Sequence, residues 1–228
     1  MGPLNLFQNI IQGSEPVINR TIPIRTISET EVEESDAFDS FNHAFPLGIS
    51  PGFAETGRLV ALAIADEKQC LIIEIQRQRS GNGKKINPPS QAVQKARQLL
   101  QEKVLCRDAG DIFAFDMGPL AMSLHTDLNI RITNAVDIQC AFSAVERKPI
   151  DAMKAALGDS IKINENNVRT LFLHPVYDHE DRHRHSELSM RAWISQFLPS
   201  FKDGAIQFNE VKRINTKDFH PQVSTVAP

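Results

Sequence analysis

The side chains best suited to chemistry lie in one short segment, residues 177–185. Histidines and acids, which hold transition metals and transfer protons, are concentrated there: Asp178, His179, Glu180, Asp181, His183 and His185. Arg182 and Arg184 lie between the histidines, and their positive charge opposes the binding of a cation. We therefore interpret the segment as a solvated insertion. A metal site and a pH-sensitive or partner-binding loop are the alternatives.

A basic loop over residues 76–89 is the second candidate. Four cations flank its Ser-Gly-Asn-Gly centre: Arg77, Arg79, Lys84 and Lys85. Such side chains contact phosphates in nucleic-acid complexes, so weak RNA contact is one prediction for this loop. The loop lacks the G-x-x-x-x-G-K-[ST] pattern of a phosphate-binding loop. A purely solvated surface loop is the alternative.

The cysteines indicate neither a zinc site nor a disulfide framework. Cys70, Cys106 and Cys140 are far apart and form no C-x-x-C pair, which excludes a zinc ribbon. Cys70 and Cys140 have apolar neighbours and are expected to be small core residues. We expect no metal ion and no other cofactor.

Composition and charge are those of an ordinary globular protein. Of the 228 residues, 41% are hydrophobic and 23% charged, and the net charge of −3 gives no general attraction to nucleic acid. No signal peptide and no apolar run of about 18 residues is apparent. We therefore expect an intracellular protein, in the nucleus or the cytoplasm (including ribonucleoprotein granules), without membrane contact.

The chain divides into three predicted regions. Residues 1–44 are expected to form a flexible arm, because Ser28–Asp36 is acidic with a single apolar residue. Removal of residues 1–40 is accordingly expected to cost little stability. Apolar side chains at helical spacing near the start predict a peptide that binds a partner or docks on the domain itself, with a frayed terminus as the alternative: Leu4, Phe7, Ile10 and Ile11. Residues 45–216 form the predicted domain, and 217–228 a loose tail.

Within the domain, strands precede a region where strands and helices alternate. Apolar, β-branched runs predict strands at 45–50, 58–65, 69–75, 111–115 and 129–133. Helical periodicity and capping residues predict helices at 91–103, 119–125, 138–144, 149–157 and 189–201. The short charged turn between 58–65 and 69–75 indicates an antiparallel hairpin. This order predicts an α/β fold with a mixed sheet flanked by helices.

Four segments of the second half match a known family in the correct order. Ile130–Gln139 is similar to "I-R-L-R-N-V-F-D-T-Q", Ala152–Gly158 to "L-x-x-L-L-G", His174–Val176 to "R-P-L" and Gln196–Phe201 to "Y-L-L-P-L-Y". On these residues, positions from about 45 to 201 resemble the DEDD 3′–5′ exonucleases, of the RNase D and exonuclease-3′–5′-domain-containing groups. The resemblance implies an RNase H-like fold.

The resemblance also implies four carboxylates that hold two divalent metal ions for phosphodiester cleavage. The family's D-x-E pair falls on Ser50 and Gly52, its third aspartate on Leu120, and its Y-x-x-x-D motif on Ser189 and Trp193. None of these residues is an acid, so the departures predict a pseudo-exonuclease. Trp193 is expected either to be core in a closed cleft, which we favour, or to form an exposed apolar patch.

Three functions follow from this interpretation. The first is a non-catalytic scaffold that binds protein partners in an RNA-processing or RNA-silencing complex, in which a homodimer would also fit. The second is a nucleic-acid-binding module on a degenerate nuclease fold. The third is a divergent active 3′–5′ exonuclease. The slightly acidic charge favours the first over the second, because phosphate binding depends on Lys and Arg.

Overall fold

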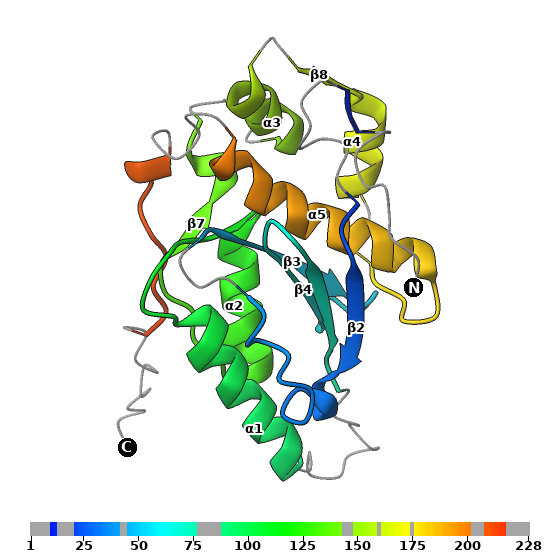
Figure 1. The fold of residues 1–228 in the computed structure, drawn as a ribbon, viewed down its shortest axis with the longest axis vertical. Helices are drawn as coiled ribbons and strands as arrows, with labels where there is room; N and C mark the ends of the chain where they lie inside the picture. Colours follow the sequence, from blue (N-terminus) through cyan, green and yellow to red (C-terminus); the bar gives the residue numbers. More distant parts are fainter. Residues whose placement is uncertain are drawn as a thin grey trace, which may run out of the picture.

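A six-stranded mixed sheet lies at the centre of the molecule, in the order β2-β5-β4-β3-β6-β7 (Figure 1). The computed structural model describes residues 10–12, 21–41, 45–76, 88–142, 148–158, 161–173, 176–201 and 208–217. The strands of this sheet are β2 (Ile24–Ser28), β3 (Leu47–Phe53), β4 (Leu59–Ala65), β5 (Cys70–Glu74), β6 (Ile112–Ala114) and β7 (Ala135–Asp137). The helices are α1 (Gln91–Leu100), α2 (Met117–Leu128), α3 (Pro149–Leu157), α4 (Glu165–Leu173) and α5 (Arg182–Ser200).

Strands β3, β4 and β5 form an antiparallel meander, as the hydrophobic runs predict. The β4–β5 turn is fixed by Asp66, whose carboxylate accepts hydrogen bonds from the backbone of Lys68 at 2.8 Å and Gln69 at 2.9 Å. The flanking strands add in parallel: β6 pairs with β3, β7 with β6, and β2 with β5. The expected mixed α/β sheet is confirmed.

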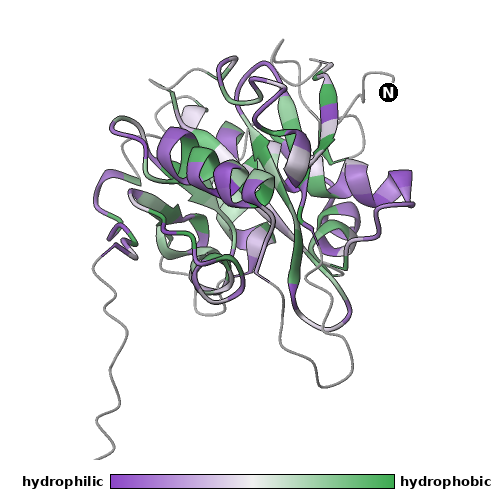
Figure 2. Ribbon diagram, turned by 90° about the horizontal axis from the view of Figure 1, so that it is seen from below, coloured by the Kyte–Doolittle hydropathy of each residue, from purple (hydrophilic) through white to green (hydrophobic). Residues whose placement is uncertain are grey.

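The two faces of the sheet are buried by different helices. Helix α5 crosses one face and carries α3 and α4 on its outer side, whereas α1 and α2 cover the other face (Figure 1). Side chains of β4 alternate accordingly: Ala61 and Ala63 belong to the core beneath α5, and Leu62 and Ile64 to the core beneath α1 and α2. Figure 2 shows hydrophobic colour concentrated along the central strands, with mixed colours on the surrounding helices.

Residues 21–41 differ from the expected flexible arm. Strand β2 pairs with β5 along five residues, from Ile24↔Cys70 to Ser28↔Glu74. Six apolar side chains larger than alanine are buried in this segment: Ile22, Ile24, Ile27, Val32, Phe38 and Phe41. The segment therefore belongs to the folded core, because its scattered apolar residues meet partners that are distant in sequence.

Part of the peptide that was predicted to bind a partner packs against this chain's own domain. Ile10 and Ile11 are buried in the core beneath α5, and β1 (Ile11–Gln12) pairs with β8 (Lys162–Ile163) in a small antiparallel sheet. These two residues therefore contact their own domain, which contradicts their assignment to a partner-binding surface. Leu4 and Phe7 lie outside the described residues.

Several element boundaries differ from the sequence prediction. Ile130 and Ile132 are buried but form no strand, and the strand follows at Ala135–Asp137. Only a short 3-10 turn, Ile138–Cys140, begins the predicted helix at 138–144, whose last two residues are outside the described part. Helix α4 was not predicted. No helix in the described ranges has the length and apolar character needed to cross a membrane.

Candidate functional site

A hollow of about 190 Å³ lies where β3, α2, α4 and α5 meet. Its walls are mostly apolar and include four polar residues, Ser50, Asp116, Arg191 and Ser195. The lining residues are Ile49, Ser50, Pro51, Phe53, Phe115, Asp116, Pro119, Phe172, Arg191 and Ser195. Concave, largely apolar sites with a few placed polar groups are typical of ligand-binding sites.

Arg191 of α5 is the central polar group of the hollow. Its side chain is directed at β3, where Nε donates a hydrogen bond to Ser50 Oγ at 3.1 Å, and Nη1 donates to the carbonyl of Leu171 at 3.0 Å. The residue is only 7% exposed. Burial lowers the pKa of Arg191 to about 10, partly offset by the nearby Glu187 carboxylate, so the guanidinium stays charged at neutral pH.

Ser195 lies one helical turn after Arg191 and lines the same hollow. Its hydroxyl donates to the Arg191 carbonyl at 2.8 Å, as buried serines in helices often do. Arg191 and Ser195 thus share one side of α5 because residues four apart lie on the same face. The helix brings both side chains to the end of β3.

Asp116 stands at the rim of the hollow, where β6 gives way to α2. Its backbone has φ of 53°, a left-handed conformation that is uncommon for residues other than glycine, and its N–H donates to Gln139 Oε1 at 2.9 Å. The carboxylate does not cap α2. Partial burial raises the pKa of Asp116. An acid and the buried cation therefore line the same hollow.

Of the positions at which the DEDD family has its acids, only some line the hollow. Ser50 does, and Gly52 lies two residues further along the same face of β3, where an added Cβ would lie 2.8 Å from the Cβ of Tyr177. Leu120 is fully buried in the core beneath α1 and α2. Ser189 is buried in α5 outside the hollow. The sequence comparison therefore identified the strand positions that lie at the hollow and its edge but not the helical ones.

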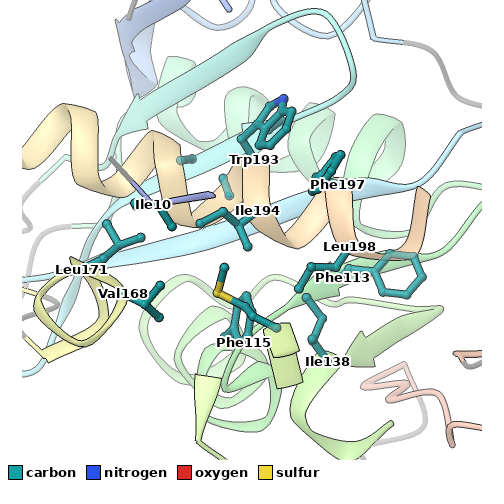
Figure 3. Close-up of a cluster of buried hydrophobic side chains, with 14 of the residues drawn as sticks. Ile10, Phe113, Phe115, Ile138, Val168, Leu171, Trp193, Ile194, Phe197 and Leu198 are labelled. Atoms are coloured by element: carbon teal, nitrogen blue, oxygen red, sulfur yellow. The ribbon is translucent and has the colours of Figure 1, made fainter. Parts of the chain in front are cut away.

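Trp193 belongs to the core. It is 2% exposed and stacks on Phe197, with ring centroids 4.9 Å apart. Figure 3 shows it on the opposite side of α5 from Phe115, which lines the hollow. The favoured expectation of a buried, core Trp193 is confirmed. Trp193 is not among the residues that line the hollow, so its indole does not fill the space beside Ser50.

Ser50 also lies at the centre of a G-x-S-x-G sequence, Gly48–Gly52. In esterases that pattern forms a sharp strand-to-helix turn, which presents the serine next to a histidine base. Here all five residues lie within β3, and the Ser50 hydroxyl faces the guanidinium of Arg191. A cation cannot accept the serine proton, so the pattern does not form a nucleophilic site.

The histidine-rich segment forms a separate cluster over the end of β5. Tyr177 donates to Glu74 Oε1 at 2.9 Å and stacks on His185, with ring centroids 5.2 Å apart. Burial, followed by the effect of Glu74, raises the pKa of Tyr177. Asp181 caps α5 by accepting from the backbone of His183 at 2.8 Å. The segment is therefore no solvated insertion throughout, because its last four residues form the first turn of α5.

The metal alternative for this segment finds little support in its geometry. His183 lies 3.4 Å from Glu187, whereas His185 Nε2 lies 3.1 Å from the carbonyl of His179. Across the described ranges, no three His, Cys, Asp or Glu side chains come together as a candidate metal site. The basic loop residues Arg77, Arg79, Lys84 and Lys85 lie outside these ranges.

The chain resembles a known protein in its structure and not in its sequence. No family model matches the sequence, and no curated protein matches it significantly. Among solved structures, the EXO domain of Nibbler from Aedes aegypti superimposes with a TM-score of 0.55 and 11% identity, over 78% of this chain and 85% of that one. The chain has an exonuclease-like fold. At this identity the likeness concerns the fold alone.

The exonuclease-like fold raises the question of whether these residues could hold two divalent ions. Such hard cations take six or more oxygen ligands, several of them anionic in protein sites. The lining of the hollow supplies one carboxylate, Asp116, together with the hydroxyls of Ser50 and Ser195. It also places the guanidinium of Arg191 against Ser50. This donor set does not fit a two-metal centre.

Proposed function

We propose that this chain is a non-catalytic exonuclease-like domain that acts as a protein-interaction scaffold in an RNA-processing or RNA-silencing complex. The observation that carries the first half is the buried Arg191, which donates to Ser50 at the strand position where the DEDD resemblance expects a metal-binding acid. The RNA-related setting rests on that resemblance.

Electrostatics supports the loss of metal-dependent catalysis. A guanidinium at hydrogen-bonding distance from Ser50 lies where the first metal ion would be held, and two like charges at about 4 Å repel by several kcal/mol when partly buried. Gly52 adds a steric reason, because any side chain there would meet Tyr177. Single substitutions therefore cannot restore the site.

A nuclease assay tests the catalytic half. The purified chain, incubated with single-stranded RNA or DNA and Mg²⁺ or Mn²⁺, is expected to shorten neither, because the hollow lacks the carboxylates for two ions. Asp116→Asn serves as the matched variant, since Asp116 is the acid that lines the hollow. Metal-dependent 3′-end shortening that disappears in Asp116→Asn would establish a divergent exonuclease instead.

The scaffold half predicts a partner surface near the end of α4. Leu173 is 63% exposed, and large exposed apolar side chains mark partner surfaces when they cluster. Val176 nearby in sequence is also exposed. The full chain, captured with its partners from native cells, is expected to lose specific partners in Leu173→Ser and to keep them in Met122→Ser, an exposed methionine on α2. Equal capture by both variants would exclude this surface.

A nucleic-acid-binding module is the second candidate function. One feature of the described residues favours it: a buried cation in the hollow with a donor nitrogen still available. Single-stranded RNA binding by the full chain, measured by fluorescence anisotropy and abolished by Arg191→Met, would favour this candidate over a scaffold alone.

A further inference from the structure

The hollow contains a buried guanidinium that forms no direct ion pair with a described carboxylate, although Glu187 acts on its charge from further away. Within the described part of the chain, no acid lies within 4 Å of Arg191. Glu187, one turn earlier on α5, is bound instead by Arg184 at 2.8 Å and His183 at 3.4 Å. A buried charge without a counter-charge is costly, so a site of this kind favours an anion.

Two hydrogen bonds hold the Arg191 guanidinium in place and leave its third nitrogen, Nη2, free to bind a ligand. Nε is held by Ser50 and Nη1 by the Leu171 carbonyl, so the plane of the fork cannot rotate freely. Nη2 makes no hydrogen bond with the described residues, and it is not among the buried side-chain nitrogens that are sealed from solvent without a partner. Since Arg191 lines the hollow, this nitrogen is available to a ligand there.

Ser50 adds a second donor at the same place. Its oxygen accepts the Arg191 Nε–H, which leaves the hydroxyl proton for another acceptor. A fixed guanidinium and a hydroxyl together match the oxygens of a phosphate group, which arginine binds well because its planar fork presents several donors. A volume of about 190 Å³ accommodates such a group.

The surroundings indicate what the phosphate is attached to. Phe115 and Phe172 form one wall, with ring centroids 4.6 Å apart. Phe172 and Asp116 also line a neighbouring hollow of about 460 Å³ between α3 and α4. A flat aromatic body stacks favourably on such rings, and nucleobases do so in many complexes.

We infer that the hollow between β3 and α5 is a metal-independent binding site for the phosphate monoester of a nucleotide. Arg191 Nη2 and the Ser50 hydroxyl bind the phosphate, and Phe172 contacts the base or sugar. The inference rests on the proposed absence of metal ions from this site. A free mononucleotide and the phosphorylated end of a single strand share this chemistry.

Asp116 lowers the affinity of the site for phosphate below the affinity that Arg191 alone would give. Its carboxylate stands at the rim and repels a phosphate dianion. Asp116→Asn is therefore expected to tighten nucleotide binding about two- to threefold, the effect of one charge several ångströms away near water. This variant removes no contact of Arg191, which makes it a control for the integrity of the fold.

Calorimetric titration of the full chain with adenosine 5′-monophosphate, in EDTA, is the test. Saturable binding is expected, and Arg191→Met is expected to weaken it by about tenfold or more, because a charge-assisted hydrogen bond is lost. Arg191→Met could also disturb the fold. Ser50→Asp avoids that problem: its carboxylate would pair with Arg191, supply the missing counter-charge, and abolish nucleotide binding with no loss of thermal stability.

Further titrations separate the two sources of phosphate. A single-stranded oligonucleotide with a terminal phosphate is compared with the same strand lacking it. Binding of either phosphorylated ligand that is lost in Ser50→Asp supports the site, and the tighter ligand identifies the source. Binding that is unchanged in both variants, that requires Mg²⁺, or that is absent at millimolar ligand overturns the inference. Nuclease activity of the same preparation would overturn the proposed function independently.

Discussion

At the scale of single residues, the contact between α5 and β3 depends on the absence of side chains. Gly48 and Gly52 lie on one face of the strand, whereas Leu47 and Ile49 belong to the core on the other face. Gly48 faces the backbone of α5, and Gly52 faces the side chain of Tyr177. A Cβ at Gly48 would lie 1.9 Å from the carbonyl oxygen of Ala192. Helix α5 can therefore bring Arg191 to Ser50 only because Gly48, which contacts the helix, has no side chain.

Gly48→Ala is accordingly expected to destabilise the protein. The new methyl meets backbone atoms of α5 that cannot rotate away, and overpacking of this kind costs about 1–3 kcal/mol or more. Gly118→Ala is the matched control: it lies in α2 with no atom near the added Cβ, and alanine should stabilise a helix by up to about 1 kcal/mol. Urea denaturation of both variants measures the difference. Equal stabilities would mean that α5 does not lie directly on β3.

The site residues could be predicted from sequence only where strand geometry governs them. Ser50 and Gly52 were identified through the DEDD resemblance, whose D-x-E pair lies on one face of a strand because strand side chains alternate. Arg191 and Ser195 were missed because the second half of α5 is buried on nearly every side. The spacing of apolar residues in this part of α5 therefore does not indicate which face of the helix is directed at the hollow. The arginine in an otherwise apolar stretch of helix could have indicated the site, because a charged side chain is rarely buried unless a partner binds it.

At the scale of elements, strand β2 is joined to α1 by a buried ion pair. Glu29 follows β2 and is almost fully buried. Its Oε1 accepts from Arg97 Nε at 2.7 Å, and its Oε2 accepts from the backbone of Gln76 at 2.9 Å. One carboxylate thus connects the edge strand, the end of β5 and the first helix.

Glu29→Ala is expected to cost about 3–5 kcal/mol, because it leaves the buried Arg97 without a counter-charge. Asp39→Ala is the control, since it breaks an exposed pair with Lys103 at 3.2 Å that is worth at most about 1 kcal/mol. Guanidinium chloride denaturation at neutral pH compares the two. A Glu29 variant as stable as the Asp39 variant would show that β2 is not held to α1 in this way.

The same ion pair explains why β2 was not predicted. The acidic stretch Ser28–Asp36 has the composition of a disordered segment when only local charge is considered. Of this stretch, Glu29 and Val32 are buried, and Glu29 pairs with Arg97, 68 positions later, which no local pattern reveals. The β4–β5 hairpin was predicted correctly because its signal, two apolar runs around a charged turn, is entirely local. Local patterns therefore defined the meander, and distant pairings defined the edges.

At the scale of the whole molecule, the N-terminal segment completes both cores. Ile22 and Ile24 belong to the core beneath α5, whereas Ile27, Val32 and Phe38 belong to the core beneath α1 and α2. The segment passes along the edge of the sheet and contributes to both layers. The domain that positions Arg191 over Ser50 thus starts well before the first strand that the sequence predicted.

Removal of residues 1–41 is therefore expected to abolish cooperative folding. The deletion exposes the edge of β5 and removes the six large buried apolar side chains of residues 21–41, each worth about 1.5–3 kcal/mol. Their combined contribution is comparable to the roughly 5–15 kcal/mol that stabilises a typical domain. Removal of residues 1–9 is the matched control, because it retains β1, β2 and both cores. Thermal melts followed by circular dichroism should show a native-like transition only for the shorter deletion. A cooperative melt at an unchanged temperature in the longer deletion would instead mean that residues 21–41 are dispensable to the fold.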